Sequence, residues 1–374
     1  MSTERIRGRL LIEREFRVGT LVVENGRIGS IELEEHARDA HELPFVAPGL
    51  VDLHVHGFGG HEPTDDLAGM ARALRAHGTT AFVPTLFPDQ PARLGATAEA
   101  VAAVARGLDA PDLALPLGVH LEGPFVNPQR AGALAPECLA EPSVEALTAL
   151  LGPSTGDGRG VRIVTLAPEL SGSPPLIEEL VRSGVRVSLG HSLATAADSR
   201  NAAKAGADGA THLFNAMGAM HHRDAGLSVF ALSDDALYAE IIGDLQHVGP
   251  EAFEMALRAR GPEGLCLVSD ALSGAGSGCE VFETHIHTCR IADGAAWIVD
   301  RENSDAEPRL AGSVTSQLEA VRRLVQAGVC SLEDALTMGA ETPARALGLE
   351  TEIGRLAVGA RADLIRLGRN LELL

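Results

Sequence analysis

Histidines and acidic residues stand at the C-terminal ends of several short apolar runs, each of which is typical of a β-strand. Imidazole and carboxylate groups are the ligands that zinc-like and iron-like divalent ions prefer in proteins. If these strand ends meet in space, the side chains can surround an ion that activates water for hydrolysis. The pattern therefore predicts a metal-dependent hydrolase, with the candidate site residues His54, His56, Glu122, His191, His212 and Asp270.

Each candidate also has an ordinary structural explanation when it is considered alone. A strand histidine is often buried and hydrogen-bonded, Glu122 could be a paired acid at the rim of the fold, and Asp270 could cap a turn. His54 and His56 are two residues apart, which places both imidazoles on one face of a strand, within reach of one ion. The coincidence of all six residues at successive strand ends favours one shared site.

The elements that must position these residues begin at Pro48, where strand-like apolar runs start to alternate with Ala-rich helical stretches. This alternation is typical of parallel strands joined by crossover helices. We predict an α/β fold, a (β/α)8 TIM-like barrel, because such a barrel gathers the C-terminal ends of its strands around one mouth. The candidate strands are 50–56, 80–86, 115–121, 162–167, 185–190, 209–213, 238–243 and 265–269, and the candidate helices are 65–76, 91–106, 174–183, 194–205, 250–259, 313–326 and 332–337.

Both ends of the chain carry strand-like segments. Near the N-terminus, segments 9–12, 19–24 and 27–33 surround the dipeptide Asn25-Gly26, which is a hairpin signal. The tail, 354–367, is again strand-like, and a strand-rich insert near 280–300 follows the last candidate barrel strand. We expect residues 1–47 and 344–374, joined by the insert, to form one small β-sandwich domain beside a barrel that spans residues 48–343.

The composition excludes two classes of partner. The chain has 31 basic and 51 acidic residues and a net charge of −20, so it lacks the basic footprint that nucleic acid or an anionic membrane requires. Its five cysteines form no CxxC pair, which predicts neither a disulfide framework nor a zinc ribbon. Because we also find no apolar signal segment and no run of about 18 apolar residues, we expect a soluble cytoplasmic protein.

Longer motifs around the candidate ligands resemble the amidohydrolase superfamily and, within it, the N-acetylglucosamine-6-phosphate deacetylase family. The resemblance covers essentially the whole chain. HLEGP at 120–124 and HLFNAM at 212–217 are specific to this branch, and the other matching segments are PGLVDLHVHG at 48–57, LGHS at 189–192, VSDA at 268–271, LAGS at 310–313, TPARALGL at 342–349 and ADL at 362–364.

The resemblance implies a role for each candidate ligand. Glu122, His191 and His212 would be the primary metal ligands, and Asp270 would lie beside the ion as the catalytic acid and base. Many relatives bridge two metals with a carboxylated lysine, but Lys204 is the only lysine here and lies in a helical stretch. Because the chain keeps the histidine pair of HVH, we expect one or two divalent ions, zinc before iron, with a second ion held by His54, His56 and a shared Glu122.

The same resemblance implies a substrate and its contacts. The reaction would convert N-acetyl-D-glucosamine 6-phosphate to D-glucosamine 6-phosphate and acetate. His247 would contact the sugar and stabilise the oxyanion, while Asn215, the backbone at Ala216, and Arg223 would bind the phosphate. In the family, the loop that bears this arginine lies near a subunit boundary, so we expect a homodimer.

Three residues depart from the family pattern, namely Leu134, Leu245 and Gln317, and all three lie in segments that we expect to face the substrate. The substrate is therefore open to alternatives, which are N-acetylgalactosamine 6-phosphate or a nonphosphorylated acylamino compound. A cyclic-amide or dipeptide amidohydrolase is a second hypothesis, although it would favour a bridging lysine at a strand end. A catalytically silent sugar-phosphate binding protein is a third, although it would not need both a metal and a proton shuttle.

Overall fold

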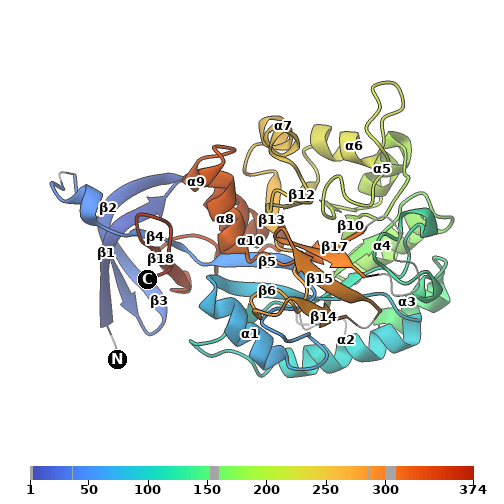
Figure 1. Cartoon of the computed structure of the whole chain (residues 1–374), viewed down its shortest axis with the longest axis horizontal. Helices are drawn as coiled ribbons and strands as arrows, with labels where there is room; N and C mark the ends of the chain where they lie inside the picture. The colour runs from blue at the N-terminus through green and yellow to red at the C-terminus, as the bar shows by residue number, and fades with distance from the viewer. Residues whose placement is uncertain (1–2, 36, 152–159, 285, 300–308) are drawn as a thin grey trace.

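The computed structural model describes residues 3–35, 37–151, 160–284, 286–299 and 309–374. Parallel strands form a barrel with helices on its outside (Figure 1). The predicted (β/α)8 barrel is confirmed. Its strands, in spatial order, are β5 (Leu50–Val55), β6 (Thr79–Leu86), β8 (Val119–Glu122), β9 (Val161–Leu166), β10 (Arg186–Leu189), β11 (Gly209–Ala210), β12 (Tyr238–Ile242) and β13 (Leu265–Val268).

Two of the predicted strands differ from those in the structure. The segment 115–121 divides into β7 (Leu115–Pro116) and β8, because Pro116 cannot donate a backbone hydrogen bond and Gly118 has a φ of 119°. The segment 209–213 contains only the two residues of β11, because His212 leaves the strand with a φ of 32°. The second of these breaks lies at a candidate metal ligand, His212.

All seven predicted helices are present and cover the barrel. Their first turns carry side-chain caps at Asp66, Thr195, Ser316 and Ser331. Among the described residues, every helix is too short or too polar to span a lipid bilayer. The predicted helices are α1 (Leu67–Ala76), α2 (Pro91–Ala105), α4 (Ser173–Arg182), α5 (Ala196–Lys204), α7 (Pro250–Arg260), α8 (Gln317–Gln326) and α9 (Leu332–Leu336), and the prediction missed α3 (Val144–Leu151), α6 (Leu227–Ser233) and α10 (Thr342–Ala346).

The two ends of the chain come together in one five-stranded sheet at the left of Figure 1. Asn25 and Gly26 close the hairpin between β2 and β3 with φ values of 51° and 77°, as the dipeptide predicts. The described strands of this domain form a single sheet rather than two stacked sheets. In spatial order they are β18 (Leu364–Leu367), β4 (Phe45–Pro48), β1 (Thr3–Ile12), β2 (Glu15–Glu24) and β3 (Arg27–Leu33).

The expectation that the insert joins this sheet is wrong. The insert forms a separate antiparallel sheet of β14 (Val281–Glu283), β15 (Thr288–Ala292), β16 (Ala295–Ile298) and β17 (Arg309–Ser313). The last residue of β17, Ser313, donates its backbone N–H to Asp270 O at 2.7 Å and bridges Ala271. These contacts attach the insert to the barrel mouth, and the helix predicted from 313 begins at Gln317 because Ser313 belongs to β17.

The barrel closes where β5 meets β13. At the mouth, Asp270 N donates to His54 O at 2.9 Å, and Val55 forms a parallel bridge with Ala271. The backbone of a candidate metal ligand therefore takes part in closing the barrel.

Deeper in the barrel, the Gln317 side chain links the same two strands. Its Nε2 donates to Val51 O at 3.0 Å and to Leu267 O at 2.8 Å, and its Oε1 accepts from Thr79 Oγ1 at 3.2 Å. Gln317 is buried and points at the strands, so the expectation that it lies in a substrate-facing segment is wrong for its side chain. The residue at this position therefore affects how the barrel closes and not how the substrate binds.

We predict that Gln317→Met lowers the free energy of unfolding by about 1–3 kcal/mol. The methionine side chain has a similar length, but it leaves two buried backbone carbonyls without their hydrogen bonds. Gln326→Met is the matched control, because Gln326 is exposed at the end of the same helix. Denaturant unfolding of both variants tests the prediction, and equal stability of the two would contradict it.

Candidate metal centre and active site

The ends of the barrel strands aim the candidate ligands into the mouth. His54 lies within β5, and Glu122 is the last residue of β8. His191, His212 and Asp270 each follow a strand and adopt left-handed backbone conformations, with φ values of 47°, 32° and 48°. Such values are uncommon for residues other than glycine, and strained residues of this kind cluster at functional sites. The turns point the side chains across the mouth.

Three side chains form a first group of metal-ligating atoms. Glu122 Oε1 lies 3.0 Å from His191 Nε2 and 3.1 Å from His212 Nε2, and the two nitrogens are 3.0 Å apart. All three side chains are buried. Ligand atoms that sit about 2.1 Å from a tetrahedral ion lie about 3.4 Å from one another, so this cluster needs little adjustment to hold one.

A second group shares Glu122 with the first. His54 Nε2 lies 3.4 Å from Glu122 Oε1, and His56 Nε2 lies 3.3 Å from Glu122 Oε2. The two Nε2 atoms are 3.2 Å apart. Asp270 Oδ1 completes the cluster at 3.5 Å from His54 Nε2 and 3.6 Å from His56 Nε2. The structure thus brings all six candidate side chains together, with Glu122 facing both pairs of histidines.

The charges in this cluster depend on one another. Burial opposes ionisation of Glu122, but the imidazoles of His191 and His212 hold its pKa well below the usual value. Burial likewise opposes protonation of His212, but the hydrogen bond to Glu122 raises the pKa of His212 to about 9. At His54 the effect of burial outweighs that of the nearby carboxylates and lowers the pKa to about 4. In the absence of metal, His212 therefore carries a proton at neutral pH and His54 does not.

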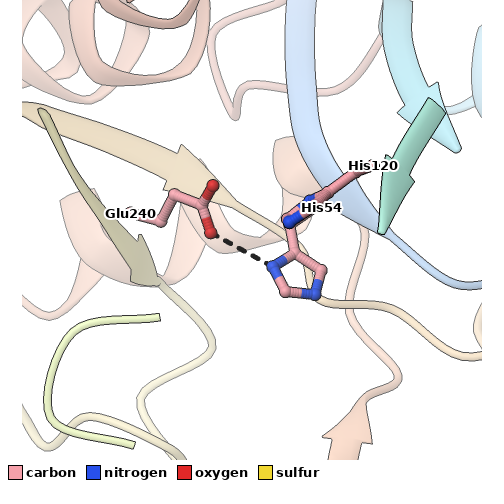
Figure 2. A group of neighbouring side chains, drawn as sticks. All are labelled: His54, His120 and Glu240. Atoms are coloured by element: carbon pink, nitrogen blue, oxygen red, sulfur yellow. Dashed lines mark hydrogen bonds and ion pairs between the residues drawn. The ribbon is translucent and has the colours of Figure 1, made fainter. Parts of the chain in front are cut away.

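Two buried residues below the mouth were missed by the sequence analysis. Figure 2 shows Glu240 and His120 on either side of His54, with Glu240 Oε2 3.1 Å from His54 Nδ1. His120 bonds through Nε2 to Thr165 Oγ1 at 2.8 Å and through Nδ1 to Leu53 O at 3.1 Å. His54, His120 and Glu240 have the side-chain types and spacing of a metal site, but both ring nitrogens of His120 already have hydrogen-bond partners. The sequence did contain one sign of Glu240, because an acidic residue inside the apolar run 238–243 is unusual for a buried strand.

The predicted substrate contacts divide into two sets. A pocket of about 160 Å³ opens beside the metal-ligating atoms, and Asn215, Ala216 and His247 line it. Arg223 is not among the residues that line this pocket. It is exposed, and its Nη1 lies 3.0 Å from His222 Nε2. Further residues at the pocket are Phe87, Gly132, Ala133, Leu134, Leu272, Leu310, Ala311 and Gly312.

His247 is held by two acceptors. Its Nδ1 lies 2.7 Å from Asp244 Oδ2, and its Nε2 lies 2.8 Å from Ala311 O. Burial opposes protonation, but these acceptors raise the pKa of His247 to about 9. Leu245, a second departure from the family pattern, takes a left-handed φ of 61° in the turn that carries this pair. His247 is therefore a hydrogen-bond donor at both ring nitrogens at neutral pH.

Comparisons with known proteins identify the family of the chain. The sequence model of the Amidohydrolase family matches residues 45–370. The chain is 35% identical to N-acetylglucosamine-6-phosphate deacetylase of Homo sapiens over 338 residues, which are 87% of this chain and 80% of that protein. It is 32% identical to N-acetylgalactosamine-6-phosphate deacetylase of Escherichia coli O157:H7 over 363 residues, which are 94% of this chain and 91% of that protein.

The fold also matches a solved structure over its whole length. That structure is a mutant of N-acetyl-D-glucosamine-6-phosphate deacetylase from Mycobacterium smegmatis in complex with N-acetyl-D-glucosamine-6-phosphate. The TM-score is 0.89 at 31% sequence identity, and the match covers 100% of this chain and 97% of the other.

We predict that zinc binding to the metal-free protein at pH 7 releases a proton from His212. Because the pKa of His212 is raised to about 9, the proton must leave before the nitrogen can bind an ion. The apparent affinity should therefore rise between pH 6 and 8, by about tenfold per pH unit for one displaced proton. Calorimetric titration in buffers of different ionisation enthalpy counts the protons, and the same heat in every buffer would contradict the prediction.

Proposed function

We propose that this chain, which belongs to the amidohydrolase family, hydrolyses the acetamide of N-acetyl-D-glucosamine 6-phosphate to D-glucosamine 6-phosphate and acetate. Membership of the family and of its deacetylase branch makes the chain a hydrolase of carbon–nitrogen bonds. The observation that carries the proposal is the convergence of four histidines, Glu122 and Asp270 at a pocket in the barrel mouth. Relatives named for this reaction match nearly the whole chain.

The donor set suits a divalent ion. Glu122, His191 and His212 would hold one ion, and His54 and His56 would hold a second with the shared Glu122. Nitrogen and carboxylate ligands suit zinc first and iron second. When bound, such an ion supplies Lewis acidity for the amide carbonyl and lowers the pKa of water to about 7.

Asp270 is the proposed acid and base. Its carboxylate lies at the mouth between the histidine pair and the pocket, where water and the amide can both reach it. It would accept a proton from the attacking water and return it to the amine as the carbon–nitrogen bond breaks. The proton that leaves the water thus ends on the amino sugar, and the acyl group leaves as acetate.

His247 is the proposed donor to the sugar or to the oxyanion. Its two N–H groups at neutral pH suit this role, because a developing negative charge needs a fixed donor. One of them is bonded to Ala311 O, and Ala311 lines the same pocket. Binding of the substrate would therefore exchange the Ala311 carbonyl for a substrate oxygen.

The phosphate would be bound by Asn215, the backbone at Ala216, and Arg223. Asn215 and Ala216 lie in the pocket, whereas Arg223 lies outside the pocket of its own chain. We therefore propose that Arg223 acts across the boundary of a homodimer. Its planar guanidinium suits two phosphate oxygens, and an acidic chain needs such a local cation. We also propose a cytoplasmic location, which suits five free cysteines.

The sugar epimer is the finer question within this proposal. N-acetylgalactosamine-6-phosphate deacetylase of Escherichia coli is nearly as similar in sequence as the human glucosamine enzyme. Leu134 lines the pocket where the family pattern has a histidine, so the wall near the sugar is less polar than that pattern implies. A cyclic-amide or dipeptide amidohydrolase is less well supported, because Lys204 ends α5 and no lysine stands at a strand end.

A panel of N-acetylamino sugars tests the reaction and the substrate together. We expect acetate release to be fastest from N-acetyl-D-glucosamine 6-phosphate, with the galactosamine isomer and the nonphosphorylated sugars slower. Asp270→Asn should lower kcat by about a hundredfold to ten-thousandfold, because the amide cannot accept a proton from water. Turnover of this variant near the wild-type rate would exclude Asp270 as the base, and no acetate from any compound would exclude a deacetylase.

The phosphate contact has its own test. Arg223→Ala should raise KM for the phosphorylated sugar by about tenfold and leave KM for the nonphosphorylated sugar unchanged, because it removes one charge-assisted contact. Arg366→Ala is a control for the loss of one exposed positive charge on β18, in the β domain. An unchanged KM for the phosphorylated sugar in Arg223→Ala would place the phosphate site elsewhere.

A further inference from the structure

We propose that Glu240 is a positioning residue for the metal centre. Glu240 accepts the Nδ1 hydrogen of His54 and so directs the Nε2 lone pair of His54 toward the second ion. This inference rests on the proposed function for the presence of the metal centre. It goes further by naming the residue on which the second ion depends.

An ionised Glu240 beside a neutral imidazole gives the hydrogen bond one direction. Glu240 Oε2 lies 3.1 Å from His54 Nδ1, and an ionised carboxylate can only accept (Figure 2). A neutral imidazole carries one hydrogen, which must then be on Nδ1. The other ring nitrogen faces His56 Nε2 at 3.2 Å and Glu122 Oε1 at 3.4 Å, where the second ion would bind. Glu240 therefore selects the tautomer that can ligate.

His54 is the only side chain of the described residues that hydrogen-bonds to this carboxylate. Glu240 lies on β12 and is 4% exposed, so water does not compensate its charge. The neighbouring His120 is occupied by Thr165 and by the Leu53 carbonyl. In the part of the chain that the structure describes, the Glu240 carboxylate accepts from the His54 ring and from the backbone N–H of His212, and it pairs with no lysine or arginine. A divalent ion on the far side of His54 would supply the missing positive charge.

The other ligating imidazoles lack a carboxylate acceptor at Nδ1. His191 Nδ1 faces a backbone carbonyl, Arg130 O, at 2.8 Å, and Nδ1 of both His56 and His212 has no hydrogen-bond partner in the described residues. A carboxylate behind a ligating histidine increases the basicity of the ligand and fixes its ring. Loss of Glu240 should therefore weaken the ion at His54 and His56 more than the ion at His191 and His212.

Zinc titration of the metal-free full chain tests this inference, with Glu240→Gln as the variant. We expect the wild type to bind two zinc ions. The variant should bind the first with wild-type affinity and the second about 10–100-fold more weakly, because an amide oxygen is a poorer acceptor than a carboxylate. Calorimetry gives both affinities, and metal content after dialysis gives the stoichiometry.

Asp52→Asn is the matched control for the loss of a buried barrel carboxylate. Asp52 Oδ1 accepts from the backbone N–H groups of His54 and Ser269, which an asparagine oxygen can also do, and in the described residues its side chain forms no hydrogen bond or ion pair with the His54 ring. We expect this variant to bind two zinc ions as the wild type does. If Glu240→Gln does not fold, as judged by circular dichroism, Glu240→Asp should show the same selective weakening, because its shorter side chain recedes from His54.

Three results would overturn the inference: one zinc ion in the wild type, two wild-type affinities in Glu240→Gln, or equal weakening of both ions. The last would mean that Glu240 only supports the barrel. Failure of the proposed function is recognised separately, because a wild type that binds two zinc ions but releases no acetate would refute the deacetylase and leave the role of Glu240 intact.

Discussion

Glu122 places one carboxylate within 3.4 Å of four imidazole nitrogens, among side chains that are almost fully buried. Lone pairs crowded in this way are costly to remove from water unless a cation compensates them. Other parts of the barrel hold these ligands together. Left-handed residues at three strand ends turn the ligands inward, and the bond between Asp270 N and His54 O joins the first strand to the last at the same level. The same backbone hydrogen bond therefore closes the barrel and holds two site residues next to each other.

The alternation of apolar strands and Ala-rich helices was sufficient to predict the barrel, because parallel strands buried on both faces have a distinctive sequence pattern. Details that depend on distant partners were not predictable. The insert was assigned to the wrong sheet, because strand propensity does not reveal that Ser313 pairs with Ala271. Gln317 was assigned to the substrate, since its bonds to two barrel strands join residues far apart in the sequence.

The candidate ligands were predictable because each stands at the end of a strand, where chemistry and position coincide. Residues that support them were not, since Glu240 sits in the middle of an apolar strand and only the barrel turns it toward His54. His120 was visible as part of a motif, but its partners Thr165 and Leu53 come from other strands. Arg223 was expected to bind the phosphate, but it does not line the pocket.

The insert sheet has a consequence for how this enzyme can evolve. Residues 310–312 form part of the pocket wall, yet they belong to a four-stranded sheet that joins the barrel mouth only beyond them, at Ser313. Substitutions within that sheet can reshape the sugar-facing wall while every ligating side chain stays on its own strand end. This part of the pocket wall can therefore change in evolution without replacement of a ligating residue.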